Sequence, residues 1–270
     1  MALYHFLLFV AVGCVVGFFA GMFGIGGGIL MVPVLVFSYE QSGVPPAVLI
    51  HISIGTSLFV IIFASLTSAY QHIKQGTVDW RAVLVMGFSS AITAFAAARV
   101  AAGMSGRHLQ VAFAAIVMAA AIRMLTESEA KAQKKLESLS KPSALGLVGV
   151  GLIAGIVAAL AGVGGGIFTI PMMYYLLNMP LKLAIGTSSA TIVITAFFSV
   201  VGYILSGMGL PDLPKWSLGF VDLQCGVALA IGTILLARVG AYVSFKIHPY
   251  RLRKLFALFV MLISIYMMVK

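Results

Sequence analysis

Charged residues are scarce in this sequence. Only 9% of the 270 residues are Asp, Glu, Lys or Arg, whereas 61% are hydrophobic. These are too few polar side chains to cover the surface of a water-soluble protein of this length. The composition therefore excludes an ordinary soluble domain and predicts an integral membrane protein whose solvent is the lipid bilayer.

Cysteine is also nearly absent. Cys14 and Cys225 lie in apolar segments without CxxC or CxxH spacing, so we expect neither a disulfide framework nor a metal site, and no motif indicates a cofactor. The net charge is +10, but Lys and Arg concentrate in a few connections, which is typical of the cytoplasmic loops of membrane proteins. Nucleic acid is therefore not an expected partner.

Apolar stretches fill most of the chain. A helix needs roughly 20 apolar residues to cross a hydrocarbon core about 30 Å thick. The apolar stretches are residues 4–23, 28–38, 47–73, 80–102 and 107–125 in the first half, and 144–161, 166–177, 182–206, 220–246 and 250–269 in the second. The predicted fold class is an all-α polytopic membrane protein.

The two halves share motifs in the same order. The pairs are GIGGGILMVP (24–33) with GVGGGIFTIP (162–171), ISIGTS (52–57) with LAIGTS (183–188), and VDW (78–80) with VDL (221–223). The polar segment 126–143 lies between them and is the expected cytoplasmic linker. We predict two homologous repeats, residues 1–125 and 144–270, that together form one membrane domain.

Basic residues indicate the orientation. The linker and the connection at 246–254 each carry four Lys or Arg residues, which places both on the cytoplasmic side. Lys74 and Arg81 fit the same side. An odd number of crossings per repeat would bring all three clusters inside together, so we expect inverted repeats. Hydropathy leaves three, four or five crossings per repeat open.

The second apolar stretch of each half is too short for an ordinary span and follows a run of glycines, which predicts a re-entrant segment or half-helix beside a protein-lined or water-filled cavity. A helix N-terminus carries free N–H groups and about half a positive charge, and glycine lets an oxyanion approach the backbone. The candidate anion-binding glycines are Gly26, Gly27, Gly28, Gly164, Gly165 and Gly166. The alternative is that these small residues only allow close helix packing.

The two GTS triplets place hydroxyl groups within apolar stretches. Thr56 and Ser57 in the first half, and Thr187 and Ser188 in the second, could bind the oxygens of an anionic substrate. The alternative is that each hydroxyl bonds to its own helix or to a neighbouring one, which is worth about 1 kcal/mol or less.

His51 and Lys182 occupy corresponding places, each four residues before the glycine of its GTS triplet. A cation there could neutralise the charge of a substrate, and His51 could bind a proton near neutral pH and so couple transport to the proton gradient. The alternative is that both side chains extend to the membrane interface.

An intramembrane enzyme is a competing class of function. No nucleophile motif and no HExxH occurs. Asp79 and Asp222 begin corresponding segments, where a carboxylate complements the helix dipole, and the sequence places them apart from His51 and the hydroxyl pairs. We therefore expect no enzymatic activity.

The paired GxGGGxxxxP motifs, each followed by IGTS, resemble the TauE/SafE family of sulfite exporters, also described as DUF81-type permeases. The resemblance covers nearly the whole chain. It implies a multi-pass transporter of the bacterial inner membrane that carries sulfite, sulfonates or related sulfur oxyanions, without deciding among them.

The expected mechanism is alternating access, in which one repeat moves against the other around an anion held by both glycine runs and both GTS triplets. An inside-negative potential favours export by about 2.3 kcal/mol per charge per 100 mV, so export needs no coupling ion. A proton-coupled importer of another small organic anion is the alternative. A passive scaffold would explain the small residues but not two copies of a helix break. Whether the protein forms a homodimer is left open by the sequence.

Overall fold

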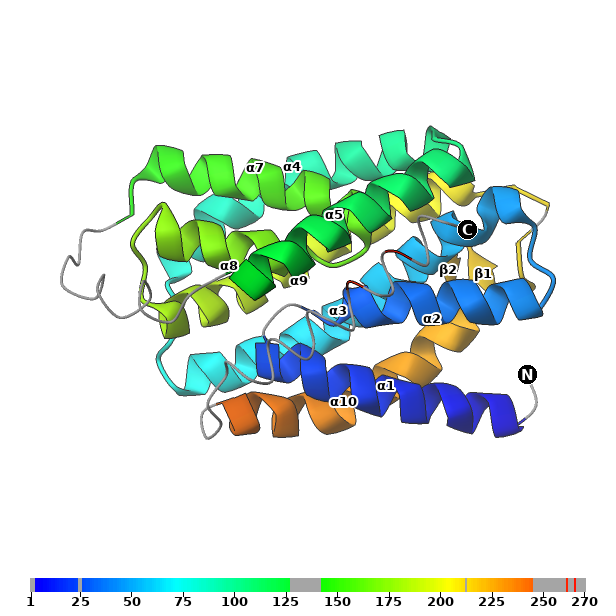
Figure 1. Cartoon of the computed structure of the whole chain (residues 1–270), viewed down its shortest axis with the longest axis horizontal. Helices are drawn as coiled ribbons and strands as arrows, with labels where there is room; N and C mark the ends of the chain where they lie inside the picture. Colours follow the sequence, from blue (N-terminus) through cyan, green and yellow to red (C-terminus); the bar gives the residue numbers. More distant parts are fainter. Residues whose placement is uncertain are drawn as a thin grey trace.

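The computed structural model describes residues 3–23, 26–126, 142–211 and 213–244, together with Met261 and Ile265. Within these residues the chain forms nine α-helices and one short β-hairpin (Figure 1). Most helices run along the long axis of the molecule. The prediction of an all-α fold is confirmed.

The predicted apolar stretches correspond to observed helices with ends that differ by a few residues. The first half contributes α1 (Leu3–Phe23), α2 (Gly28–Gln41), α3 (Pro46–Lys74), α4 (Trp80–Gly103) and α5 (Gly106–Thr126). The second half contributes α7 (Ala144–Ala161), α8 (Gly166–Tyr175), α9 (Leu181–Gly207), β1 (Ser217–Leu218), β2 (Val221–Asp222) and α10 (Leu223–Ser244). The predicted stretch 250–269 and most of the predicted linker lie outside the described residues.

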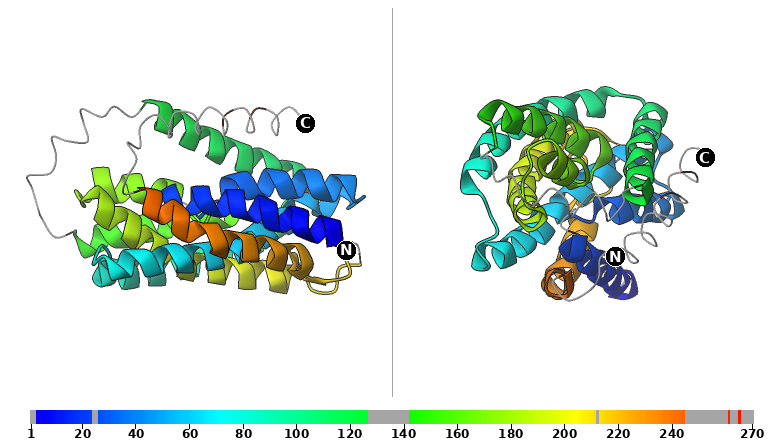
Figure 2. Two further views of the ribbon diagram at one scale, coloured as in Figure 1. Left: turned by 90° about the horizontal axis from the view of Figure 1, so that it is seen from below. Right: turned by 60° about the vertical axis from the view of Figure 1, so that its left-hand side comes forward.

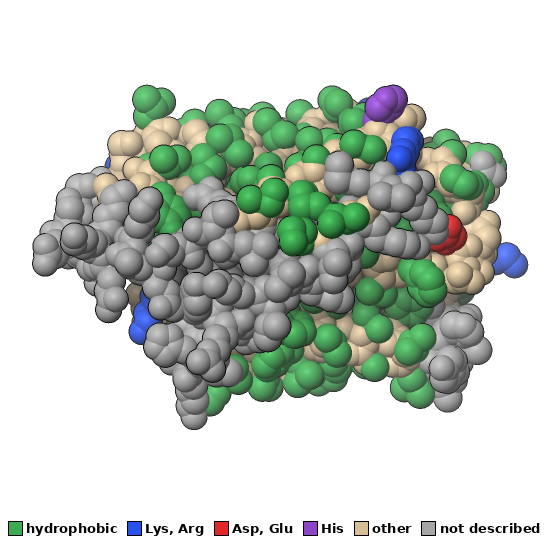
Figure 3. All heavy atoms as spheres, viewed as in Figure 1, with side chains coloured by type: hydrophobic (Ala, Val, Ile, Leu, Met, Phe, Trp, Pro, Cys, Tyr) green, Lys and Arg blue, Asp and Glu red, His purple; other side chains and the backbone are tan. Residues whose placement is uncertain are grey.

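Five of the helices are long and apolar enough to cross a bilayer. They are Pro46–Lys74, Trp80–Gly103, Ala144–Ala161, Lys182–Gly207 and Leu223–Gly240. Many large apolar side chains are exposed, and Phe88 on α4 is 74% exposed. Figure 3 shows apolar side chains spread over the described part of one face. An apolar exterior of this kind fits lipid rather than water.

The tightest helix pairs each combine one helix from each half of the chain. Gly13, Gly17 and Gly21 on α1 face the backbone of successive turns of α10, where a Cβ on any of them would collide with a carbonyl oxygen. Gly151 and Gly155 on α7 meet α4 in the same way. Both pairs run parallel, and Figure 2 shows α1 beside α10. Small residues of this kind let helix backbones approach closely in membranes.

These contacts group most of the helices into two bundles. Each bundle consists of helices from one half of the chain together with one helix from the other half. The first bundle contains α1, α2, α3 and α10, and the second contains α4, α7, α8 and α9. The bundles meet mainly where α3 packs against α9. Gly55, near the start of α3, lies against Phe220 after α9, and Gly186, near the start of α9, lies against Thr77 after α3, so α3 and α9 are antiparallel.

The helix directions place several basic positions on one side. In Figure 1, α3 ends and α4 begins at the left-hand end, where α7 also begins and α10 ends. Lys74 is the last residue of α3, and Arg81 is in the first turn of α4. Helix α5 runs toward the same side before the linker. The side with these basic residues is the one that the positive-inside rule assigns to the cytoplasm.

Candidate functional site

Both glycine runs interrupt the helical path. The first break lies between α1 and α2, with residues 26–28 as its described part, and the second break, residues 162–166, connects α7 to α8. Gly26 and Gly27 have φ angles of 78° and 79°, and the corresponding Gly164 and Gly165 have 72° and 83°. Glycine adopts this left-handed conformation without the steric cost of a side chain. The two half-helices therefore begin at glycines with the same backbone geometry.

The two breaks lie against each other at the centre of the molecule. Gly28 is so close to Gly162 and Val163 that an added Cβ would collide with the Gly162 carbonyl oxygen. A Cβ on Gly26 would lie 3.3 Å from the carbonyl oxygen of Val163. Helices α2 and α8 lead away from this contact in opposite directions (Figure 1), so both helix N-termini, which carry partial positive charge, lie near the centre.

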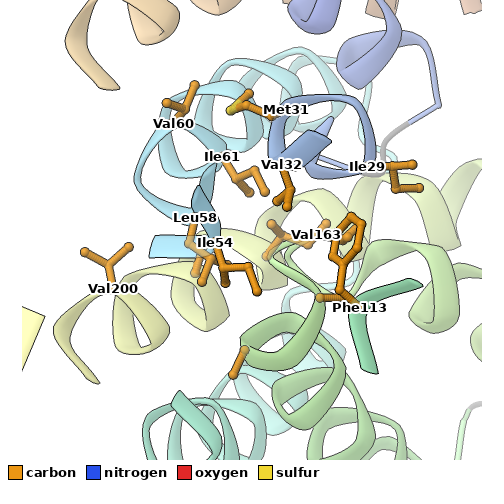
Figure 4. Packing of buried hydrophobic residues seen from close by; sticks show 14 of the residues in the cluster. Ile29, Met31, Val32, Ile54, Leu58, Val60, Ile61, Phe113, Val163 and Val200 are labelled. Carbon is orange, nitrogen blue, oxygen red and sulfur yellow. The ribbon is translucent and has the colours of Figure 1, made fainter. Parts of the chain in front are cut away.

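Apolar side chains enclose the breaks. A Cβ on Gly26 would lie 3.0 Å from Ile61 Cγ2, and one on Gly164 would lie 3.1 Å from the same atom and 2.7 Å from Ile192 Cγ2. All described glycines of both breaks are buried, and Figure 4 shows Ile61 beside Val32 and Val163. The two breaks thus lie together, with apolar side chains packed against both.

Each GTS threonine holds the start of a helix from the other half of the chain. Thr56 Oγ1 accepts a hydrogen bond of 2.9 Å from the backbone N–H of Asp222. Thr187 Oγ1 accepts one of 3.0 Å from the backbone N–H of Asp79. We call these contacts the Thr56–Asp222 clasp and the Thr187–Asp79 clasp. The first attaches α10 to the first bundle, and the second attaches α4 to the second bundle.

The glycine of each triplet makes room for its clasp. A Cβ on Gly55 would collide with the carbonyl oxygen of Phe220, two residues before Asp222. A Cβ on Gly186 would collide with the carbonyl oxygen of Thr77, two residues before Asp79. The GTS and VD motifs are therefore two sides of one contact, and each occurs twice.

The clasps correct one conclusion from the sequence. The sequence placed Asp79 and Asp222 apart from the hydroxyl pairs, whereas each aspartate is directly bonded to a GTS threonine. The error arose because the partners lie in opposite halves of the chain. Thr56 and Thr187 are thus engaged in packing the helices, as the alternative interpretation of these hydroxyls proposed.

The GTS serines lie closer to the breaks than the threonines do. Ser57 Oγ donates a 2.9 Å hydrogen bond to the carbonyl oxygen of Gly162, within the second break. The Oγ of Ser188 lies 2.9 Å from Thr169 Oγ1 on half-helix α8, and Thr169 Oγ1 in turn donates to the carbonyl oxygen of Gly165. Both serines are fully buried. They are therefore the predicted hydroxyl groups best placed to reach an anion at the breaks.

The structure does not bring His51 and Lys182 together. His51 is buried near the start of α3, where its Nε2 lies 3.1 Å from the carbonyl oxygen of Met104 and its ring stacks on Phe220 at 5.2 Å. Lys182 is exposed in the first turn of the antiparallel helix α9. The two side chains lie toward opposite ends of the molecule, so one substrate cannot contact both at once.

The carboxylates of both clasps also cap helices, as the sequence predicted. Asp79 Oδ1 accepts a 3.1 Å hydrogen bond from the N–H of Ala82 at the start of α4. Asp222 Oδ1 accepts bonds of 2.9 Å from Gln224 and 3.1 Å from Cys225 at the start of α10. The other carboxylate oxygen of Asp222, Oδ2, accepts a 3.2 Å bond from the hydroxyl of Tyr39 on α2.

Tyr39 is a polar partner that the sequence analysis missed. Its one distinguishing signal was a tyrosine near the end of an otherwise apolar half-helix. A tyrosine at such a position is common in membrane proteins, where its ring suits the interface, so its burial beside a carboxylate could not be predicted.

Comparison with known proteins supports the membrane assignment. The sequence profile of the family described as "Sulfite exporter TauE/SafE" matches residues 9–267. A Haemophilus influenzae protein named a probable membrane transporter protein is 31% identical over 264 residues, which cover 98% of each chain. A Methanocaldococcus jannaschii protein, also named a probable membrane transporter protein, is 29% identical over 91% of this chain and 89% of its own.

Two further results define the extent of these similarities. An Arabidopsis thaliana protein named sulfite exporter TauE/SafE family protein 5 is 35% identical over 82 residues, which cover 30% of this chain and 16% of its own. No solved structure matches the chain. Because the family profile covers nearly the whole sequence and the relatives are transporters rather than enzymes, this chain is a multi-pass membrane transporter of the sulfite exporter TauE/SafE family.

Proposed function

We propose that this protein exports a small sulfur-containing oxyanion, such as sulfite or an organosulfonate, across the cell inner membrane by alternating access. The observation that carries the proposal is the contact between the two glycine breaks, where Gly28 lies against Gly162. Family membership supports the choice of a sulfur oxyanion.

The proposed anion site is built from backbone N–H groups. The first N–H groups of a helix have no partner within that helix, and two such N-termini lie near each other where α2 and α8 begin. Their partial positive charges suit an anion in a medium of low dielectric constant. Ser57 and Ser188 would add hydroxyl donors from α3 and α9. Thr56 and Thr187 would position the site through the clasps.

The conformation described here corresponds to a closed site. Ile61 and Ile192 lie within van der Waals distance of where a Cβ on Gly164 would lie, and both are buried. An anion of sulfite size cannot reach the break N–H groups until these side chains move. We propose that Ile61 and Ile192 shift when the two bundles separate on one side, and that the site then opens to water on that side.

The moving bodies in this proposal are the two bundles rather than the two sequence repeats. Motion of one repeat against the other would separate α1 from α10 and α4 from α7, which are the closest helix contacts in the molecule. Such contacts do not deform continuously. A rigid movement at the α3–α9 contact keeps both pairs and both clasps intact while changing the space around the glycine breaks.

Export of an anion by this route needs no coupling ion, because an inside-negative potential contributes about 2.3 kcal/mol per charge per 100 mV. Proton-coupled import of another small organic anion is the second candidate. The buried carboxylate of Asp222 favours it, because uncoupled transport needs no buried ionisable group.

Two measurements on the purified protein test the proposal. Sulfite, sulfate, thiosulfate and sulfoacetate should differ in how much they raise the melting temperature, since a ligand that binds the folded state stabilises it by mass action. The best ligand should also show saturable flux in proteoliposomes. If no anion stabilises the protein more than sodium chloride does, and flux equals that of empty liposomes, anion transport is rejected.

A further inference from the structure

The Thr56–Asp222 clasp contains an ionisable group that the proposed anion site does not use. We propose that Asp222, with Tyr39 and Thr56, forms a proton-binding site that couples proton movement to anion transport. This inference rests on the proposed transport function and adds a second ligand, the proton, at a separate place in the first bundle.

Three buried side chains from three elements meet at this site. Asp222 precedes α10 and is 4% exposed, Tyr39 on α2 is 3% exposed, and Thr56 on α3 is fully buried. The hydroxyl oxygen of Tyr39 lies 3.2 Å from Asp222 Oδ2 and 3.4 Å from Thr56 Oγ1. One hydroxyl thus reaches the carboxylate on one side and a neutral oxygen on the other.

The charge of Asp222 is not needed for its role as a helix cap. Ser143 caps α7 with a neutral hydroxyl, which accepts a 3.2 Å hydrogen bond from the N–H of Gly146, and Asn caps helices about as well as Asp. A buried carboxylate costs free energy that a neutral cap avoids. The carboxylate at position 222 can therefore ionise, a property that capping does not use.

Few charged or titratable groups surround Asp222. Among the described residues Asp222 forms no hydrogen bond or ion pair with Lys or Arg. The titratable groups that face it are Tyr39 from α2 and Cys225 from its own helix. Two residues before Asp222, the ring of Phe220 stacks on His51 of α3, with ring centroids 5.2 Å apart, and packs edge-on against Tyr203 of α9 at 6.4 Å.

Tyr39 can serve both protonation states without moving. When Asp222 is ionised, the Tyr39 hydroxyl donates to Oδ2. When a proton binds to Oδ2, that O–H donates to the Tyr39 oxygen, and the tyrosine hydrogen turns toward Thr56 Oγ1. The proton adds to one oxygen, the charge of the site changes from −1 to zero, and no other bond is broken.

The second clasp lacks this relay. Counted from the prolines that the two glycine motifs share, Leu177 stands where the first half has Tyr39. Asp79 is also only partly buried, whereas Asp222 is buried. Asp79 therefore provides a matched control with the same capping bond and the same threonine contact but no tyrosine. Tyr39 belongs to the half-helix that begins at the first glycine break, which links the proton site mechanically to the anion site.

Transport in proteoliposomes tests the inference, with radiolabelled sulfite as the probe. Exchange of internal for external sulfite at equal pH reports the anion site without net proton movement. Net sulfite flux under an imposed pH gradient, with the membrane potential clamped by potassium and valinomycin, reports coupling. Wild-type protein and Asp79→Asn should show both, whereas Asp222→Asn should keep exchange and lose the response to the gradient.

Each result distinguishes the two proposals. Wild-type exchange without any response to the pH gradient overturns the proton site and leaves transport standing. A response that survives in Asp222→Asn, or is lost equally in Asp79→Asn, also overturns it. Absence of exchange in the wild type, with labelled sulfite and equally with labelled sulfoacetate as the probe, rejects the proposed function itself.

Tyr39→Phe decides the case if Asp222→Asn is inactive in both assays. This variant keeps the cap and the carboxylate but removes the hydroxyl that donates to the ionised form. The pH at which the response is half-maximal should then shift upward, because a hydrogen bond that stabilises the ionised form has been lost. An unchanged midpoint would overturn the proposed relay.

Discussion

Gly28 and Gly162 meet with no room between them for a single added carbon: a Cβ on Gly28 would collide with the Gly162 carbonyl oxygen. The contact joins the start of α2 in the first bundle to the end of α7 in the second. Ser57 holds the same carbonyl oxygen through a 2.9 Å hydrogen bond. The closest approach of the two glycine breaks is thus also a contact between the two bundles that we propose to move.

Replacing Gly28 with alanine should abolish sulfite flux and lower stability. The new methyl group would push apart two backbones that cannot yield, and overpacking of this kind costs about 1–3 kcal/mol. Gly149→Ala is the matched control, because an added Cβ at Gly149 on α7 meets no atom within 4 Å. Flux in proteoliposomes and melting temperature check both variants. Normal flux in Gly28→Ala would remove this contact from the mechanism.

The two clasps should contribute to stability separately. Thr56→Val and Thr187→Val each leave a buried N–H of an aspartate unpaired, which costs about 1–3 kcal/mol. Thr191→Val should cost less, because Thr191 bonds only to the Thr187 carbonyl oxygen of its own helix. Thermal unfolding of the single variants and of the double variant measures the losses. The two losses should add, because the clasps lie in different bundles; equal losses at Thr191 and Thr56 would contradict a special role of the clasps.

Lys182 should not affect substrate binding. Its side chain is exposed and lies far along the molecule from His51, so Lys182→Gln should leave the sulfite concentration for half-maximal flux unchanged. Concentration dependence of flux at constant ionic strength provides the measurement. A marked rise in that concentration would show that a second conformation brings Lys182 to the anion.

Cross-links between helices should show which bodies move. Ser68 and Ser189 join α3 to α9, with their Oγ atoms 3.2 Å apart. Ser90 and Thr195 join α4 to α9 within the second bundle, with their hydroxyl oxygens 2.8 Å apart. After replacement of the two natural cysteines, an oxidised Ser68→Cys/Ser189→Cys pair should block flux reversibly.

The Ser90→Cys/Thr195→Cys pair is the control for this experiment, because it connects helices that move together in our proposal. It should leave flux intact in both redox states. Inhibition by both cross-links would indicate that the sequence repeats move rather than the bundles, because α3 and α4 both belong to the first half of the chain and α9 to the second.

Local sequence predicted much of this structure, but not how its halves combine. Apolar length located the described helices, and the glycine runs located both breaks, because backbone conformation at Gly26–Gly27 and Gly164–Gly165 depends on the residues present there. The clasps join residues 108 and 166 positions apart. No local pattern reveals such contacts, nor the close packing of α10 on α1 and of α4 on α7.

For the candidate site too, the sequence predicted the local motifs but not the contacts between them. The doubled GTS and VD motifs were visible, yet their mutual contact was not, since each motif read alone fits a hydroxyl in a helix and an ordinary helix cap. His51 and Lys182 correspond in sequence but lie toward opposite ends, because α3 and α9 are antiparallel. These two corresponding positions therefore lie toward opposite ends of the molecule rather than in one site.

Hydrogen–deuterium exchange of the purified protein with and without sulfite tests the central claim most directly, because the claim concerns backbone N–H groups at the two glycine breaks. Sulfite should slow exchange in peptides that cover the starts of α2 and α8, and sodium chloride at equal ionic strength should not. Protection at both starts is the result that we predict. Protection elsewhere in the chain, with neither start affected by a sulfite concentration that saturates flux, would contradict the account.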